Sequence, residues 1–207
     1  MKFLILNGSP HKEGTTSAAL AEVAKTMREG GAEVELMQIG SQAVRGCTAC
    51  MYCKENESCV ICDTVNEAAE RFREADGLIV GSPVYYASPS GTVISFLDRL
   101  FFSTKFDKTM KLGAAVVCAR RAGTSAALDV INKYFLISGM PIIPSTYWNM
   151  VHGSASGAEA ALDSEGMQTM RNLGRSAVFL AEAISKRDKA ANLAPLERGI
   201  RTNFIKN

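Results

Sequence analysis

The fold follows from one stretch near the start of the chain, Phe3-Leu4-Ile5-Leu6-Asn7-Gly8-Ser9-Pro10-His11-Lys12-Glu13-Gly14-Thr15-Thr16-Ser17. The apolar run 3–6 stops abruptly at Asn7-Gly8, which predicts a short buried strand. Apolar residues with a helical period begin just beyond Thr16, so the stretch predicts a strand, a loop and a helix. Such a loop can turn its backbone N–H groups and hydroxyls toward a phosphate dianion in front of the helix N-terminus.

The polar side chains of this loop and of the first helical turn are the phosphate-binding candidates: Ser9, His11, Thr15, Thr16 and Ser17. The spacing is not that of a Walker A loop, because no Gly-Lys-Ser/Thr closes it, and it is not a GxGxxG dinucleotide fingerprint. The alternative is an ordinary strand-to-helix turn with a Ser or Thr N-cap.

Length and composition limit the classes of protein that remain. The chain has 207 residues, a net charge of +2 and 47% hydrophobic residues, which fits one globular domain with an excursion. Acidic and basic residues are interspersed, so neither nucleic acid nor an anionic membrane is an expected partner. The apolar run 3–6 is too short for a signal peptide and no stretch reaches the length of a membrane span, so we expect a cytoplasmic protein.

The rest of the chain alternates strand and helix patterns. Further strands are predicted at 32–37, 77–81, 112–118 and 142–147, and helices at 65–73, after Gly91, after Gly123 and over 159–186. This alternation predicts an α/β fold, with a doubly wound five-stranded parallel sheet in the order 2-1-3-4-5 and helices on both faces. The domain is predicted to span 1–188, with an excursion at 41–63. The irregular tail 189–207 packs either on another subunit or across its own domain.

Three polar loops follow strands that this order places side by side. Ligands of such sheets bind outside the carboxyl ends of the strands at the switch point, which lies between the first and third strands. The meeting of the first loop with loops 82–91 and 119–123 favours a flavin mononucleotide (FMN), with its phosphate on the first loop and its ring against the second. The additional candidate contacts are Ser82, Pro83, Val84, Tyr85, Tyr86, Arg120, Arg121 and Gly123.

Two features of these loops have alternative explanations. Tyr85 and Tyr86 offer a flat wall for an isoalloxazine ring, or else cap the end of the sheet. Arg120 and Arg121 provide positive charge near the N1–C2 edge of a flavin, where an anion forms on reduction, or else form a solvated corner.

Five of the six cysteines lie between Cys47 and Cys62. The spacing Cys47-x2-Cys50-x2-Cys53-x5-Cys59 brings four soft thiolate ligands together, which suits an iron–sulfur cluster or zinc, and leaves Cys62 over. It lacks the wide gap of two-knuckle zinc sites. A redox-active CxxC pair and plain free thiols are the alternatives that need no metal.

The three polar loops also resemble those of a known family. Residues 6–16, 81–86 and 119–123 resemble, in the same order, the phosphate, ring and third cofactor loops of NAD(P)H-dependent FMN reductases with the flavodoxin-like fold. The cysteine spacing is similar to that of the iron–sulfur flavoprotein branch of this family. The resemblance implies FMN, NAD(P)H as co-substrate and a [4Fe–4S] cluster on Cys47, Cys50, Cys53 and Cys59. It also implies a homo-oligomer, dimer or tetramer, in which neighbouring subunits complete the site.

Three functions follow as hypotheses. The first is an FMN-dependent oxidoreductase with no catalytic side chain of its own. It takes electrons from NAD(P)H and passes them to a quinone, an aromatic, oxygen or an iron–sulfur acceptor. The second is an iron–sulfur flavoprotein electron carrier that is reduced by a ferredoxin-like donor. The third is a thiol redox sensor that uses the cysteine segment.

Overall fold

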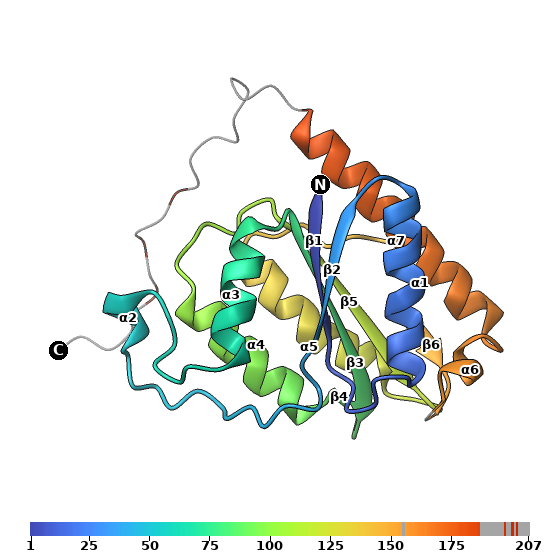
Figure 1. Cartoon of the computed structure of the whole chain (residues 1–207), viewed down its shortest axis with the longest axis horizontal. Coiled ribbons are helices and arrows are strands. Elements are labelled where there is room, and N and C mark those ends of the chain that lie inside the picture. Colours follow the sequence, from blue (N-terminus) through green and yellow to red (C-terminus); the bar gives the residue numbers. More distant parts are fainter. Residues whose placement is uncertain (155, 187–196, 198–199, 201, 203–207) are drawn as a thin grey trace.

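The computed structural model describes residues 1–154, 156–186, 197, 200 and 202, and a parallel sheet forms its centre (Figure 1). The sheet has five parallel strands whose order confirms the predicted 2-1-3-4-5 arrangement, and a short strand pairs antiparallel with the end of the third. Across the sheet the parallel strands are β2 (Glu33–Gln38), β1 (Lys2–Asn7), β3 (Gly77–Tyr85), β5 (Leu112–Ala119) and β6 (Met150–His152), and the short strand is β4 (Ser88–Pro89).

Helices cover both faces of the sheet, as the alternating pattern predicts (Figure 1). One face carries α1 (Thr15–Glu29), α6 (Gly157–Ala160) and α7 (Ser164–Ser185). The other face carries α3 (Thr64–Glu74), α4 (Gly91–Ser103) and α5 (Thr124–Ile137). The remaining helix, α2 (Cys53–Asn56), is a single turn in the excursion between β2 and α3.

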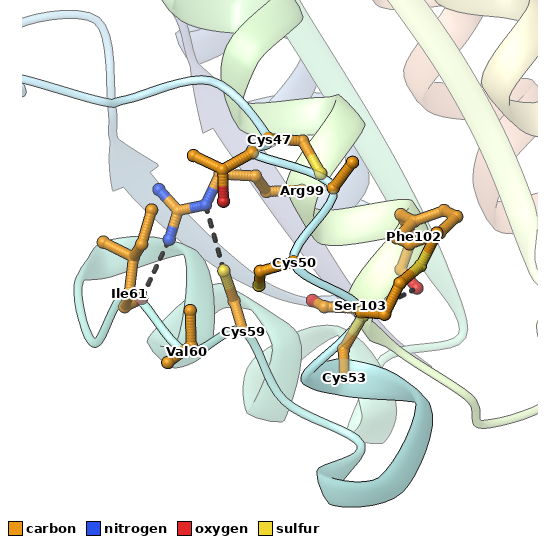
Figure 2. Close-up of a pocket in the computed structure, with 12 residues that line it drawn as sticks. Cys47, Cys50, Cys53, Cys59, Val60, Ile61, Arg99, Phe102 and Ser103 are labelled. Carbon is orange, nitrogen blue, oxygen red and sulfur yellow. Dashed lines mark hydrogen bonds between the residues drawn. The ribbon is translucent and has the colours of Figure 1, made fainter.

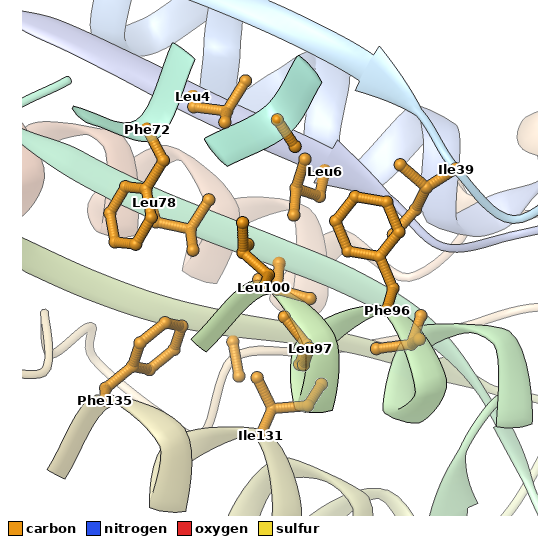
Figure 3. Packing of buried hydrophobic residues seen from close by; sticks show 14 of the residues in the cluster. Leu4, Leu6, Ile39, Phe72, Leu78, Phe96, Leu97, Leu100, Ile131 and Phe135 are labelled. Carbon is orange, nitrogen blue, oxygen red and sulfur yellow. The ribbon is translucent and has the colours of Figure 1, made fainter. Parts of the chain in front are cut away.

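Two hydrophobic clusters, one on each face, hold these layers together. Leu4 and Leu6 of β1 belong to the cluster under α3, α4 and α5, whereas Phe3 and Ile5 belong to the cluster under α1 and α7. Alternate side chains of a strand point to opposite faces, so a continuous apolar run is the pattern of a strand that is buried on both sides. Figure 3 shows the first cluster, in which phenylalanines from the three helices pack over the strand residues.

The predicted last strand at 142–147 is wrong, although the last strand does lie at the edge of the sheet, as expected. Ile142 forms only an isolated bridge with Gly113 of β5, and the last strand is β6, Met150–His152. Pro144 has no N–H to continue the ladder, and pairing resumes where Val117 N donates to Asn149 O (3.0 Å). The chain leaves the edge of β5 over these residues and returns to it.

The predicted long helix over 159–186 is confirmed for most of its length as α7, but its first turn is separate and forms α6. Asp163 begins the second helix, where its Oδ1 accepts a hydrogen bond from Gly166 N (2.9 Å). Its Oδ2 accepts one from His152 N (2.7 Å), so one carboxylate links the edge strand β6 to the start of α7. Aspartate is a preferred N-cap residue, because its side-chain oxygen accepts from a backbone N–H two or three residues on, so Asp163 marks the start of a new helix.

No helix within the described ranges is long and apolar enough to cross a membrane. The predicted tail 189–207 lies outside the described residues apart from positions 197, 200 and 202.

Asp163 gives a pH-dependent prediction. Burial acts to raise the pKa of Asp163, but hydrogen bonds from the His152 and Gly166 N–H groups outweigh it, so the pKa lies below the ordinary carboxyl value. A carboxyl of this kind stabilises the fold above its unfolded pKa of about 3.9, and the stabilisation is lost as pH falls through the folded pKa. We predict that Asp163→Asn lowers the free energy of unfolding by about 1 kcal/mol near neutral pH.

Urea unfolding of both proteins at a series of pH values measures this difference. The gap between wild type and Asp163→Asn should close as pH falls from about 5 to 2. Asp163→Ala, which also removes the acceptor for both N–H groups, should remain less stable than Asp163→Asn throughout. A stability difference between wild type and Asp163→Asn that does not change with pH would contradict the lowered pKa of Asp163.

Candidate functional site

The first loop joins β1 to α1 and leaves the start of that helix without a capping side chain. Asn7 is buried and its Oδ1 accepts from Ser9 N (3.1 Å), while Ser9 Oγ accepts from His11 N (3.2 Å). Gly14 is the N-cap, so among the described residues no side chain caps α1, and no acidic residue lies in its first turn. The first-turn N–H groups and the helix dipole therefore favour an anion at the hollow that residues 10–14 line.

The structure divides the predicted phosphate-binding side chains into two groups. Ser9 is buried, His11 exposed and Ser17 half-buried around the open end of α1. The other two face the protein: Thr15 Oγ1 lies 3.1 Å from Ser154 O and 3.2 Å from Ser156 O, and the Thr16 hydroxyl contacts the Cys118 thiol. Contact of any of the five with a phosphate stays a prediction.

The second loop is a tight hairpin between β3 and β4. Tyr85 pairs with Ser88, and the two residues between them, Tyr86 and Ala87, have φ angles of 51° and 59°. Positive φ at both central positions defines a type I′ turn, in which residues with a Cβ are strained. Tyr85 is 47% exposed and Tyr86 fully exposed, so Tyr86 does not cap the end of the sheet. Both rings are free to contact a ligand.

The first and second loops are in direct contact. Gly8 N donates to Gly81 O (2.8 Å), and a Cβ on Gly8 would lie 2.1 Å from Val93 Cγ2. Ser90 caps α4 by accepting from Val93 N, and its hydroxyl donates to Gly8 O (3.3 Å). The buried Ser82 hydroxyl donates to Pro83 O (2.8 Å) and accepts from Ser90 N (3.0 Å). The Ser82 side chain is therefore bonded to backbone groups at both ends of the second loop and holds that loop in place.

The third loop packs against the hairpin. Gly123 has a φ of 87°, and a Cβ at this position would lie 2.8 Å from Ala87 Cα and 3.2 Å from Val84 Cγ1. Arg120 and Arg121 are exposed, as a solvated corner requires and as a ligand contact would also allow. The structure thus brings the three predicted loops together at the carboxyl edge of the sheet.

A fourth loop, whose described residues are 153–154 and 156–157, lies beside the first. Gly153 N donates to Ala119 O (3.1 Å) and Gly157 N donates to Glu13 O (2.9 Å). A Cβ on Gly153 would lie 2.7 Å from Thr15 Oγ1. The sequence shows this loop only as a run of small residues, and its contact with the first loop depends on where β6 enters the sheet.

The four predicted cysteine ligands line a single pocket (Figure 2). Cys47, Cys50, Cys53 and Cys59 share it with residues from the second half of α4, whereas Cys62 is not among its lining residues. All six cysteines of the chain are free thiols. The four cysteines that the spacing groups together thus line one pocket, and Cys62, which the spacing leaves over, does not line it.

The backbone around Cys50 is unusual. Ala49 and Met51 have φ angles of 53° and 62°, a left-handed conformation that costs about 1–2 kcal/mol for each residue with a Cβ. The pKa of Cys50 lies below its ordinary value, chiefly because the Tyr52 backbone N–H donates to the sulfur, with a further contribution from the Thr48 side chain. Strain here is combined with stabilisation of a thiolate.

The residues present fit a group held by four thiolates in donor type, in number and in their common pocket. Within the described ranges, however, no three His, Cys, Asp or Glu side chains are gathered at metal-binding distance. The sulfurs must therefore move closer together to act as ligands. The candidate site therefore has two parts. The first is a polar rim, formed by the three loops at the carboxyl edge of the sheet. The second is the thiol pocket, which residues of α4 also line.

One residue of the pocket escapes prediction from sequence. Arg99 of α4 is 1% exposed and forms a bidentate ion pair with Asp63, at 2.7 and 2.9 Å. Burial acts to raise the pKa of Asp63, and the hydrogen bonds from Arg99 and from Val65 N outweigh it, so this pKa is lowered. The only signal in the sequence is that Arg99 falls on the same helical face as Phe96 and Leu100, where an arginine needs a partner.

The sheet, its helices and the polar rim define a protein with a flavodoxin-like α/β fold. Solved structures that share this fold include a flavodoxin from Bacillus cereus (TM-score 0.59, 15% identity, 86% of this chain and 98% of that one) and an NAD(P)H:(acceptor) oxidoreductase from Paracoccus denitrificans (TM-score 0.63, 16% identity, 88% and 97%).

The chain belongs to the NADPH-dependent FMN reductase family, whose model matches residues 1–155. It is also 30% identical over 193 residues to an iron-sulfur flavoprotein from Methanocaldococcus jannaschii, which covers 90% of this chain and 100% of that protein. It is therefore a flavin-dependent redox protein of this family.

The contact between the second and third loops can be tested with two glycines that have nearly the same positive φ angle. Gly123 and Gly31 have φ angles of 87° and 84°, but a Cβ on Gly31 meets nothing within 4 Å. We predict that Gly31→Ala costs only the strain of a left-handed residue, about 1–2 kcal/mol. Gly123→Ala should cost about 1–3 kcal/mol more, because its Cβ must displace the backbone of Ala87.

Denaturant unfolding of both variants measures the two costs. Equal costs would mean that the third loop does not depend on the hairpin.

Proposed function

We propose that the protein is an iron–sulfur flavoprotein electron carrier that accepts electrons from a ferredoxin-like donor. The observation that carries this proposal is the pocket shared by Cys47, Cys50, Cys53 and Cys59, in a chain whose family binds FMN. Full-length similarity to a protein named iron-sulfur flavoprotein supports it. When bound, a [4Fe–4S] cluster passes single electrons and FMN stores a pair, so the two together convert one kind of transfer into the other.

The rim at the carboxyl edge would hold the flavin. The open N-terminus of α1, with Ser9, His11 and Ser17 around it, would bind the phosphate. The exposed Tyr85 and Tyr86 would lie against the ring, which their rigid hairpin supports. Arg120 and Arg121 would supply positive charge near the N1–C2 edge. The fit is supported by a hollow beside a helix end that no side chain caps in the described part of the chain.

The thiol pocket would hold the cluster through Cys47, Cys50, Cys53 and Cys59. Cysteine thiolates are the ligands of iron–sulfur clusters, and hydrogen bonds to the sulfurs and exposure of the site set the reduction potential. The Tyr52 N–H bond to Cys50 is one such bond already present. Neighbouring subunits of a dimer or tetramer would bring the pocket of one subunit and the rim of another together.

A second candidate function is an NAD(P)H-driven FMN reductase that passes electrons to a quinone, an aromatic or oxygen. The description of the matching family, NADPH-dependent FMN reductase, favours it. The two functions differ in the electron donor and in the need for the cluster. They are therefore separable in one protein preparation.

The phosphate site is tested by placing a negative charge in the first turn of α1. We predict that Ser17→Asp weakens FMN binding about five- to tenfold, because the carboxylate competes with the phosphate for the helix dipole. Riboflavin, which lacks the phosphate, should bind the variant and the wild type equally. Ser17→Asn is the neutral control of similar size. Quenching of flavin fluorescence measures all these affinities, and an equal loss for FMN and riboflavin would place the phosphate elsewhere.

The electron-carrier proposal is tested with two cysteine variants. Anaerobically purified wild type and Cys62→Ser should contain about four iron and four sulfide atoms per chain, and Cys53→Ser should contain almost none. Stopped-flow absorption should show that reduced ferredoxin bleaches the flavin of the first two proteins and not of Cys53→Ser.

Two results would decide against a carrier. Fast reduction of all three proteins by NADPH, with no response to ferredoxin, would favour the reductase. Iron-free wild type that forms reversible disulfides and changes its assembly would favour a thiol redox sensor.

A further inference from the structure

Arg99 is the most completely bonded buried group of the thiol pocket. A guanidinium has five N–H donors, and the structure gives Arg99 five hydrogen bonds. Two go to the Asp63 carboxylate, at 2.7 and 2.9 Å, and two to backbone carbonyls, Arg45 O at 3.3 Å and Ile61 O at 2.8 Å. The fifth runs from Nε to the Cys59 sulfur at 3.2 Å, and Figure 2 shows it beside the bond to Ile61.

These partners lie at the two ends of the cysteine segment. Arg45 precedes the first cysteine ligand, whereas Ile61 and Asp63 follow the last. Asp63 also accepts from Val65 N (3.0 Å) as the N-cap of α3, so the end of the segment is fixed to a helix. The Arg99 side chain therefore holds the two ends of the cysteine segment together. We call this junction, made by Arg99 with Arg45, Ile61 and Asp63, the neck of the segment. Between the two ends the segment contains only one helical turn, α2.

Helix α4 carries this contact to the rim. Its N-cap, Ser90, donates to Gly8 O in the first loop, and Phe102 and Ser103 near its other end line the thiol pocket. At a rise of 1.5 Å per residue, Ser90 and Arg99 lie about 13 Å apart along the helix axis. Helix α4 thus fixes the distance between the rim and the neck of the cysteine segment within one subunit.

We propose that Arg99 is a positioning residue that closes the cysteine segment and raises the reduction potential of the group bound to Cys59. This inference rests on the proposed function only for the potential. An N–H···S bond from a cation stabilises the more negative, reduced state of a thiolate-bound cluster. Lysine can replace arginine here only in part, because an ammonium has three donors and no planar fork.

The first experiment uses metal-free protein, so that it does not depend on the cluster. Trypsin can cut after Arg45 and Lys54, which are both exposed in the segment. Cleavage of Arg99→Met should be at least about tenfold faster than that of wild type, because hydrogen bonds from a charged group no longer hold the neck closed. Arg99→Lys should fall between them. Arg171→Met is the matched control, since it removes an arginine paired with Glu22 (2.8 Å) between α7 and α1.

The second experiment uses protein loaded with iron and sulfide. Iron release to a chelator should be about ten- to a hundredfold faster in Arg99→Met than in wild type, and the midpoint potential should be lower. Asp63→Asn provides the opposite test, and it also replaces Arg99→Met if that variant does not fold. It removes a negative charge and keeps the Nε bond to Cys59, so the potential should rise although the neck is weakened.

The outcomes separate the two proposals. Wild-type rates of cleavage and iron release in Arg99→Met, or potentials that shift in the same direction in Arg99→Met and Asp63→Asn, would overturn the role of Arg99 and leave the electron carrier intact. Wild type that binds no iron would overturn the electron carrier and the claim on the potential. The trypsin rates would then decide the neck closure alone.

Discussion

The contact of β1 with β3 at their carboxyl ends is the constraint on which the site depends. Gly8 N bonds Gly81 O at 2.8 Å, and α4 begins so close that a Cβ on Gly8 would meet Val93. Because this contact holds the first loop against the second, and Gly123 holds the third against the second, three segments far apart in sequence form one rim. A larger side chain at either glycine would separate loops that must act on the same ligand.

The second feature of the site is built on the far end of the same helix. Arg99 is the charged residue that lines the thiol pocket, and its half-buried partner Asp63 lies outside the lining. Loss of Asp63 would be costly, because it would leave a buried guanidinium without its compensating charge. The rim combines backbone groups and small polar residues with two tyrosines and two arginines. The pocket is lined by four thiols, one guanidinium and several apolar side chains. Helix α4 contacts the rim at its start and the thiol pocket at its end. The helix therefore fixes the distance between the rim and the pocket, although the two differ in chemistry.

Much of this could be predicted from the sequence, because local pattern decides it. Apolar runs mark three of the five parallel strands and an alternating pattern marks a fourth. Their alternation with helices favours the common sheet order, which decides which loops meet. The last strand was mispredicted because 142–147 has the composition of a strand, while Pro144 prevents the pairing and the true strand has three residues. The roles of Arg99 and of the glycines Gly153 and Gly157 escape prediction, since both depend on contacts with residues distant in sequence.

The central claim is that the three loops form one flavin site. Hydrogen–deuterium exchange of the backbone amides, with and without FMN, tests it most directly. We predict that 9–17, 82–91 and 119–123 become protected together, at the same FMN concentration. Protection confined to one of these loops, or found only at another edge of the sheet, would contradict it.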